Sequence, residues 1–191
     1  MINMEGRIVY FEEKGEMNTE VTLRLAKERA LELGIKHVVV ASTSGRTGKR
    51  AVEVFEGSGI DIVVVSHQFG YKQPNKLEMD DELRRFIESK AKLVVGSDLF
   101  TTVPKLTQKY GGWNPFNIVA DTLRLFCEGM KVCIEIAVMA ADAGAIPTDE
   151  EVIAIAGTAK GADTAIVLKP ANIHRFFEID VREIICMPRV R

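Results

Sequence analysis

The stretch that decides the fold is VVVASTSGRTGKRAVEVF, which runs from Val38 to Phe55. Three β-branched residues lead into a loop of hydroxyl, glycine and basic residues, and the spacing after the loop predicts a helix. A strand that is apolar at every position is typical of a parallel sheet with both faces covered. The stretch therefore predicts one strand–loop–helix unit of an α/β protein.

The same alternation continues on both sides of this unit. Helices are expected near 17–35, 48–59, 78–90, 115–127 and 130–146, and strands near 7–13, 36–41, 60–66, 91–97, 150–157, 164–171 and 178–190. Alternating strands and helices indicate a three-layer α/β/α sandwich with a mostly parallel sheet. The last strands follow one another without long helices, so we expect an antiparallel or mixed edge. No linker or repeat divides the chain, and residues 1–191 are expected to form a single α/β domain.

The first predicted helix carries start and stop signals of its own. Asn18 is a suitable N-cap and Gly34 a suitable terminator. Val21, Leu25 and Leu31 lie on one stripe, which is expected to face the core.

The loop after the strand at Val38 is a candidate phosphate site. Its glycines allow backbone amides to face a guest, its hydroxyl and basic side chains favour an anion, and the following helix points its N-terminus to the same place. The candidate residues are Ser42, Thr43, Ser44, Gly45, Arg46, Thr47, Gly48 and Lys49. The spacing of the two glycines and the Arg50 after Lys49 exclude the nucleotide-hydrolase P-loop, and no G-x-G-x-x-G is present. The alternative is an ordinary strand–helix turn with capping hydroxyls.

Two further loops follow predicted strands. The first supplies Gly157, Thr158, Lys160, Gly161 and Asp163 as ligand contacts, with a tight turn as the alternative. The second supplies Ser66, His67, Gln68 and Phe69. We expect His67 to line a pocket rather than to perform chemistry, because no acid or nucleophile partner is visible in the sequence. Tyr71 and Trp113 are candidate ring-stacking residues beside Phe69.

Composition excludes several classes of function. A net charge of −2 with a pI near 6.0 argues against a nucleic-acid partner. No apolar run is long enough for a membrane helix and no signal peptide is recognisable, so a cytoplasmic protein without a membrane partner is expected. No metal-binding motif is present, and Cys127, Cys133 and Cys186 are expected to be buried structural thiols.

Two features have open alternatives. Glu135 lies among apolar residues and is predicted to be a polar edge of a buried helix, a ligand acceptor or the partner of a core Lys or Arg. The segment Gly111–Asn117 is predicted to cap a pocket, form a packed corner or make an oligomer contact.

The segment TEVTLRLAKERALELGIKHVVVASTSGRTGKRAVEVF resembles the C-terminal α/β domain of pyruvate kinase. That family has a T-x-S-G-[RK]-[ST] loop after the strand, which Ser42, Ser44, Gly45, Arg46 and Thr47 match with serine in place of the first threonine. The resemblance is good over 18–66, fair in strand order to about Val95 and weak beyond. It implies the pyruvate kinase C-terminal domain fold and a phosphate pocket, because this loop binds a phosphate of the effector in pyruvate kinases regulated by sugar bisphosphates.

No kinase chemistry is implied, because 191 residues cannot contain the catalytic barrel of pyruvate kinase. The chain is similar to small stand-alone pyruvate-kinase-like proteins of archaea and some bacteria. The predicted function is therefore binding of a phosphorylated small molecule, nucleotide-like and for example flavin mononucleotide (FMN). The alternatives are an enzyme acting on a phosphorylated metabolite, with His67, Lys49 or Glu135 as acid or base, and an assembly module in which the ligand controls a homo-oligomer.

Overall fold

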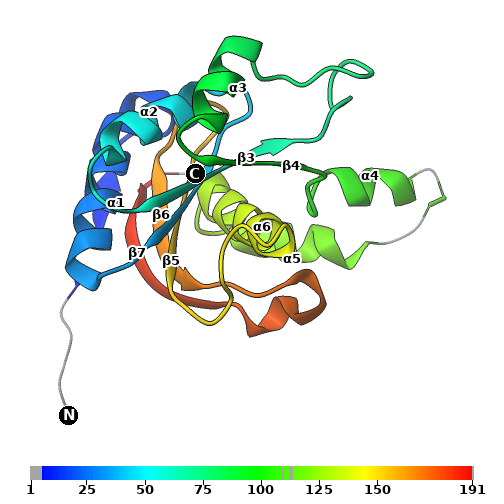
Figure 1. Ribbon diagram of the computed structural model, residues 1–191. Helices are drawn as coiled ribbons and strands as arrows, with labels where there is room; N and C mark the ends of the chain where they lie inside the picture. Colours follow the sequence, from blue (N-terminus) through cyan, green and yellow to red (C-terminus); the bar gives the residue numbers. More distant parts are fainter. Residues whose placement is uncertain (1–5, 109, 112–113, 191) are drawn as a thin grey trace.

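A computed structural model describes residues 6–108, 110–111 and 114–190 of the chain. Its centre is one seven-stranded sheet in the order β1-β7-β6-β5-β2-β3-β4 (Figure 1). The strands are β1 (Val9–Phe11), β2 (His37–Ala41), β3 (Asp61–His67), β4 (Lys92–Gly96), β5 (Val152–Ala156), β6 (Thr164–Lys169) and β7 (Asp180–Pro188).

The sheet is mixed, as the sequence predicts. β2 pairs in parallel with β3 and β5, β3 with β4, and β1 with β7, whereas β6 runs antiparallel to its neighbours β5 and β7. The chain leaves β2 toward β3 on one side and later returns to β5 on the other side of β2. The carboxyl ends of β2 and β5 therefore form a topological switch point, where open α/β sheets bind ligands.

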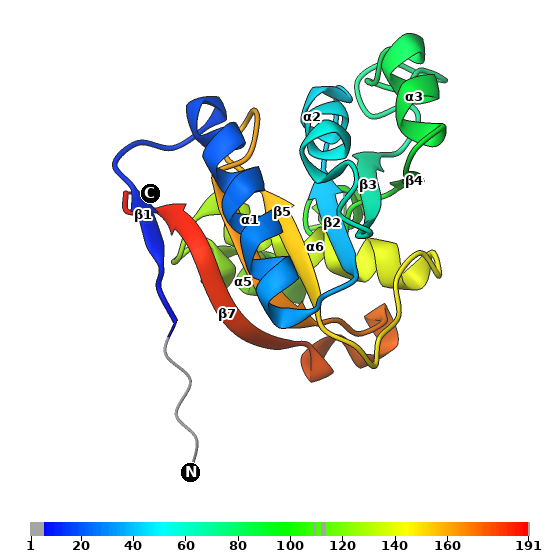
Figure 2. The ribbon, with the colours of Figure 1, turned by 60° about the vertical axis from the view of Figure 1, so that its left-hand side comes forward.

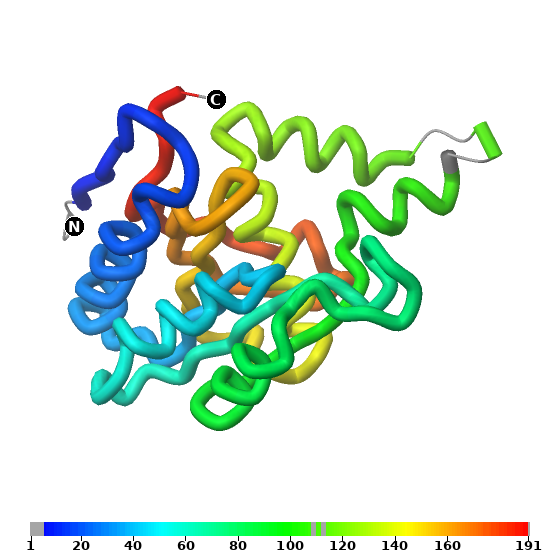
Figure 3. Tube along the Cα trace, turned by 90° about the horizontal axis from the view of Figure 1, so that it is seen from above, coloured from blue at the N-terminus to red at the C-terminus, as the bar shows by residue number. Residues whose placement is uncertain are grey.

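Helices cover both faces of the sheet, which makes three layers. On one face α1 packs on β5, β6 and β7, α2 on β2 and β3, and α3 on β4, while α6 crosses the other face over β2 to β6 (Figure 2). The helices are α1 (Thr19–Leu33), α2 (Arg46–Phe55), α3 (Asp81–Glu88), α4 (Thr102–Gln108), α5 (Pro115–Leu123) and α6 (Glu128–Asp142). In Figure 3, α4 and α5 lie on the same side of the body, away from α1.

The central strands separate two apolar clusters. Along β2, Val39 faces α6 while Val38 and Val40 face α1 and α2, and all three side chains are fully buried. Because successive side chains alternate between the two faces of a strand, an unbroken apolar run is required where helices cover both faces. This is the physical reason why the stretch Val38–Val40 fixes the position of the strand.

Three details differ from the sequence expectation. Gly34 ends α1 in a left-handed conformation as expected, but the side chain of Asn18 donates to the Glu13 carbonyl instead of capping the helix. Leu31 is 55% exposed, since α1 packs on the sheet through Leu23 and small residues such as Ala26. The helix α4 and the short 3-10 helices η1 (Glu16–Asn18) and η2 (Ile173–Glu178) were not expected from hydrophobic periodicity.

Candidate functional site

Within the described structure, the loop between β2 and α2 leaves backbone amides without an internal partner at the start of a helix. Gly45 adopts the left-handed conformation (φ 87°) directly before the first helical residue, Arg46. The hydroxyl of Ser42 accepts the Gly48 amide at 2.9 Å, and the Lys49 amide donates to the Gly45 carbonyl at 2.8 Å. The backbone amides of Arg46 and Thr47 form no hydrogen bond with any residue that the structure describes. The helix therefore begins with two open N–H groups and the positive end of its dipole.

The two basic side chains of this loop have different surroundings. Arg46 is exposed and forms no ion pair with another described residue. Lys49 lies along the helix, with Nζ 3.9 Å from Oε1 of Glu53 and 5.5 Å from the ring centroid of Phe86 on α3. Arg46 is therefore the cation that remains available to an anion at the helix start.

The loop glycines also have packing roles. A Cβ on Gly48 would lie 2.8 Å from Cγ1 of Val64 and 3.1 Å from Cδ1 of Ile87, and a Cβ on Gly45 would lie 2.9 Å from Cγ of Met79. These contacts hold the start of α2 close to β3 and α3. The glycine spacing that resembles a phosphate loop is thus also required for close packing.

The loop between β5 and β6 begins beside the α2 loop, because Ile155 of β5 pairs with Val40 of β2. In Figure 2 it rises next to the start of α1. A Cβ on Gly157 would meet Cα of Ala162 at 2.8 Å, and one on Gly161 would meet Oγ1 of Thr19 at 2.3 Å. The glycines therefore let this loop fold tightly against α1, as the tight-turn alternative predicts.

Asp163 lies beneath this loop and not in its opening. Its side chain is fully buried, and Oδ2 accepts the amides of Gly15 at 2.8 Å and Thr158 at 3.1 Å, while Oδ1 accepts the hydroxyl of Thr164 at 2.8 Å. These bonds give the carboxylate an internal role in joining the β5–β6 loop to the segment before α1. Of the candidates on this loop, Lys160 is exposed and Thr158 half-buried.

The third loop brings His67 against a partner that sequence reasoning missed. His67 ends β3, and its Nδ1 lies 3.1 Å from Oδ2 of Asp98, which follows β4. Tyr71 stacks on the imidazole with ring centroids 4.1 Å apart and an interplanar angle of 5°. The signal in the sequence that could have found Asp98 is its position. Asp98 follows the strand after β3, and the carboxyl ends of neighbouring parallel strands meet at one edge of the sheet.

The other candidate residues of this loop already form contacts within the protein. Ser66 is buried, and its hydroxyl donates to the Thr43 carbonyl at 3.4 Å, which links the ends of β2 and β3. Gln68 donates from Nε2 to Oγ1 of Thr102 at 3.2 Å. Phe69 is half exposed and lies near the guanidinium of Arg84.

A buried ion pair lies behind this region. Nζ of Lys131 donates to Oε2 of Glu135 at 2.6 Å, and Oε1 of Glu135 accepts the Phe100 amide at 2.7 Å. Burial raises the pKa of Glu135, and Lys131 opposes that effect. Glu135 therefore has the core-lysine partner that was one of its alternatives.

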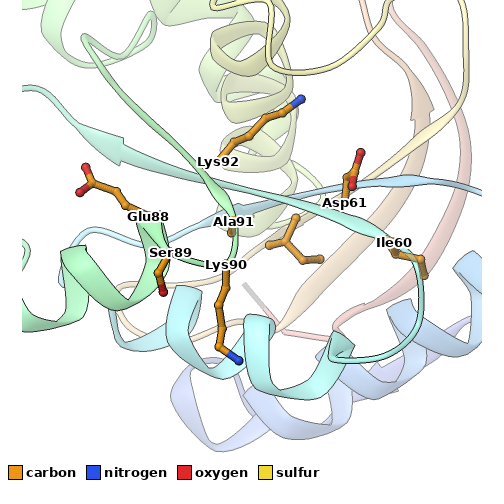
Figure 4. Close-up of a pocket in the computed structure, with 8 residues that line it drawn as sticks. Ile60, Asp61, Glu88, Ser89, Lys90, Ala91 and Lys92 are labelled. Carbon is orange, nitrogen blue, oxygen red and sulfur yellow. The ribbon is translucent and has the colours of Figure 1, made fainter.

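The cavity drawn in Figure 4 lies at the opposite edge of the sheet. It has a volume of about 270 Å³ and is lined at the amino ends of β3 and β4 by residues that include Ile60, Asp61 and Lys92. Figure 4 shows the side chains of Lys90 and Lys92 pointing in different directions around it. It is remote from the switch point, and no candidate residue from the sequence lies in it.

Several expectations concern residues outside these loops. Cys127, Cys133 and Cys186 are free and buried, as expected, and burial raises the pKa of Cys186 to about 12. Trp113 lies outside the described residues, as does part of the segment 111–117. In the described part of that segment, Asn114 caps α5. Within the described ranges, no group of three or more His, Cys, Asp or Glu residues could hold a metal ion. None of the helices in those ranges is long and apolar enough to cross a membrane.

The family comparison decides what kind of domain this is. The model of the pyruvate kinase alpha/beta domain matches residues 20–168, which is 149 of 191 residues. The chain belongs to the pyruvate kinase alpha/beta domain family. The match includes the α2 loop, the His67 loop and the β5–β6 loop of this alpha/beta domain, and it extends well beyond the segment in which the sequence resemblance is strongest.

Proposed function

We propose that this alpha/beta domain binds a phosphorylated small molecule at the carboxyl edge of its sheet. The observation that carries the proposal is the start of α2, where the amides of Arg46 and Thr47 are open within the described structure and Arg46 is exposed beside them. A phosphate dianion accepts hydrogen bonds from such amides and is stabilised by the helix dipole and a guanidinium.

The position of this loop supports the same proposal. It lies at the switch point between β2 and β5, the place where open α/β sheets bind ligands. Residues at or after the carboxyl ends of three strands lie at this edge: Thr47 in the first turn of α2, His67 at the end of β3 and Lys160 in the β5–β6 loop. The remainder of the ligand would lie over them while its phosphate stays at α2.

A nucleotide-like ligand, for example FMN, fits this surface better than a bare sugar phosphate. Phe69 is half exposed and offers an aromatic face to a ring, whereas His67 and Tyr71 already stack on each other. The ring of such a ligand would lie over the β5–β6 loop at the same edge.

The test compares FMN with riboflavin, which has the same ring but no phosphate, by quenching of flavin fluorescence. The wild-type domain should bind FMN more tightly than riboflavin. Arg46→Ala should weaken FMN binding by about 1.5–3 kcal/mol, the size of a charge-assisted hydrogen bond, without changing riboflavin binding. Arg24→Ala on the exposed side of α1 is the matched control and should behave as the wild type. Equal affinities of the wild type and Arg46→Ala for FMN would remove the α2 loop from the site.

A second candidate function, ligand-controlled assembly, is favoured by the region of α4 and α5. Large apolar side chains are exposed on α4, on α5 and just after α5, where a second subunit could cover them: Leu106, Ile118, Leu125 and Phe126. Sedimentation velocity with and without inorganic phosphate separates the two functions. A phosphate-dependent change of mass supports assembly control, and an unchanged mass with bound phosphate leaves simple binding.

A further inference from the structure

The ends of β3 and β4 create a second polar arrangement that phosphate binding does not use. His67 pairs with Gly96 across the two strands, and Asp98 follows two residues later. As a result Nδ1 of His67 lies 3.1 Å from Oδ2 of Asp98. The two groups come from different strands, so the sheet itself sets their spacing.

Asp98 is held rigidly as an anion. Its side chain is 2% exposed, and Oδ1 accepts the amides of Thr101 and Thr102 at the start of α4. Burial raises the pKa of Asp98, but the hydrogen bonds from His67 and Thr102 outweigh burial and lower it to about 2. In the described structure Oδ2 accepts no well-formed hydrogen bond, and its one ion-pair contact is with Nδ1 of His67. A buried carboxylate oxygen in this position requires a donor, so Nδ1 of His67 must carry a proton.

This arrangement fixes the tautomer of His67. With a proton on Nδ1, the other ring nitrogen, Nε2, carries the free lone pair and can accept a hydrogen bond. Tyr71 covers one ring face and Asp98 occupies the Nδ1 edge, while the side chain of His67 is still 28% exposed. The open part of the ring is therefore its second face and the edge that carries Nε2.

A neighbouring atom points to a guest at this place. Oε1 of Gln68 is buried and has no hydrogen-bond partner among the described residues, although Nε2 of the same side chain donates to Thr102. A buried acceptor without a donor costs free energy, which a ligand hydroxyl could recover. The side chain of Gln68 bonds to Thr102, whose amide donates to Asp98, so this acceptor lies near the dyad.

The charges around the dyad are few and defined. Lys105 on α4 lies with Nζ 5.6 Å from the ring centroid of Tyr71. Behind the Asp98 loop, Lys131 and Glu135 neutralise each other and hold the Phe100 amide. Asp98 has no Lys or Arg partner in the described structure, so His67 is the basic side chain that faces it.

We propose that His67 and Asp98 form a proton-transfer dyad that acts on a hydroxyl group of the phosphorylated ligand. In the step itself, the O–H bond of the ligand breaks, a bond from that hydrogen to Nε2 of His67 forms, and the electron pair stays on oxygen. His67 is the catalytic residue, and Asp98 is a positioning residue that keeps the second proton on Nδ1. The inference rests on the proposed function, because the hydroxyl that reacts belongs to the ligand whose phosphate binds at α2. The hydrogen bond from Ser66 to Thr43 links the end of β3 to that phosphate loop.

The first experiment measures the dyad without any ligand. The 15N shifts of the His67 ring should show a protonated Nδ1 at high pH in the wild type. In Asp98→Asn the amide nitrogen can donate to Nδ1, so the proton should move to Nε2. Carbethoxylation of His67 by diethyl pyrocarbonate, which requires an unprotonated nitrogen, should then slow by roughly tenfold or more. His174, which is exposed, is the internal control and should react equally in both proteins. An Nε2–H tautomer in the folded wild type, or equal His67 rates in the two proteins, would overturn the dyad.

The second experiment separates the dyad from the phosphate loop. Inorganic phosphate should slow carbethoxylation of His67 in the wild type, and this protection, measured against each protein's own rate without phosphate, should disappear in Arg46→Ala. If phosphate binds but leaves the His67 rate unchanged, the dyad does not face the ligand and this proposal fails while the proposed function stands. If phosphate does not bind at all, the proposed function fails and the proposed ligand step fails with it.

Discussion

At the scale of single residues, buried polar groups organise the carboxyl edge of the sheet. Asp163 ties the β5–β6 loop to the segment before α1, and Asp98 ties β3 to the start of α4. Both carboxylates are buried and both accept backbone amides. The loops around the candidate site are therefore preformed by internal hydrogen bonds.

Asp98 should make stability depend on acid pH. Its pKa is lowered from 3.8 to about 2 in the folded protein, so it stabilises the fold fully above about pH 4, and this contribution is lost as the pH falls toward 2. The lost contribution is about 2 kcal/mol. In Asp98→Asn, urea unfolding followed between pH 4 and pH 2 should lose less stability than in the wild type. Asp149→Asn at an exposed position is the control. Parallel curves for the wild type and Asp98→Asn would contradict the ion pair.

Close packing at Gly129 gives a second prediction at this scale. A Cβ there would lie 2.1 Å from Oγ1 and 2.5 Å from Cβ of Thr164, a buried residue that bonds to Asp163 and Cys127. Gly129→Ala should therefore destabilise the protein by about 1–3 kcal/mol despite the better helix propensity of alanine. Gly6→Ala, where a Cβ meets nothing within 4 Å, should not change the urea midpoint.

At the scale of elements, α3 forms the wall behind the loop between β2 and α2. Met79 and Leu83 pack against Gly45, and Asp80 caps α3 by accepting the amides of Glu82 at 2.9 Å and Leu83 at 3.4 Å. The start of α2 therefore depends on a helix that is itself only eight residues long.

Removal of the cap should loosen this wall. Asp80→Ala should lower the free energy of unfolding by about 0.5–2 kcal/mol, because two amides lose their acceptor. Asp81→Ala, one residue further on, removes a charge from the first turn without removing the cap and should cost only a few tenths of that amount. Chemical denaturation of the two variants side by side decides the matter, and equal losses would show that charge rather than capping stabilises α3.

At the scale of the whole molecule, hydrophobic periodicity predicted the three layers, the parallel strands and the mixed part of the sheet. It missed α4, whose seven residues carry no clear apolar stripe and begin at the hydrogen bonds to Asp98. Hydrophobic periodicity also predicted that Leu31 lies in the core, which is wrong. A stripe of large residues is easier to recognise in a sequence than the small-residue face of α1 that lets the helix approach the sheet.

The candidate site was predictable where it is local in sequence. The α2 loop is one continuous segment, so its amides and cation could be read from residues 42–49. The His67–Asp98 contact joins residues 31 positions apart, and only the pairing of β3 with β4 reveals it. The role of Asp163 was hidden for the same reason, since its partner Gly15 lies 148 positions away.

The most direct measurement of phosphate binding at α2 is a titration of the 15N-labelled protein with inorganic phosphate, followed through its backbone amide resonances. The amides of Arg46 and Thr47 should show the largest shifts, and Arg46→Ala should weaken the apparent affinity while Arg24→Ala should not. If the resonances of those two amides do not shift at phosphate concentrations that shift other amide resonances, or if no amide resonance shifts, phosphate does not bind at the start of α2.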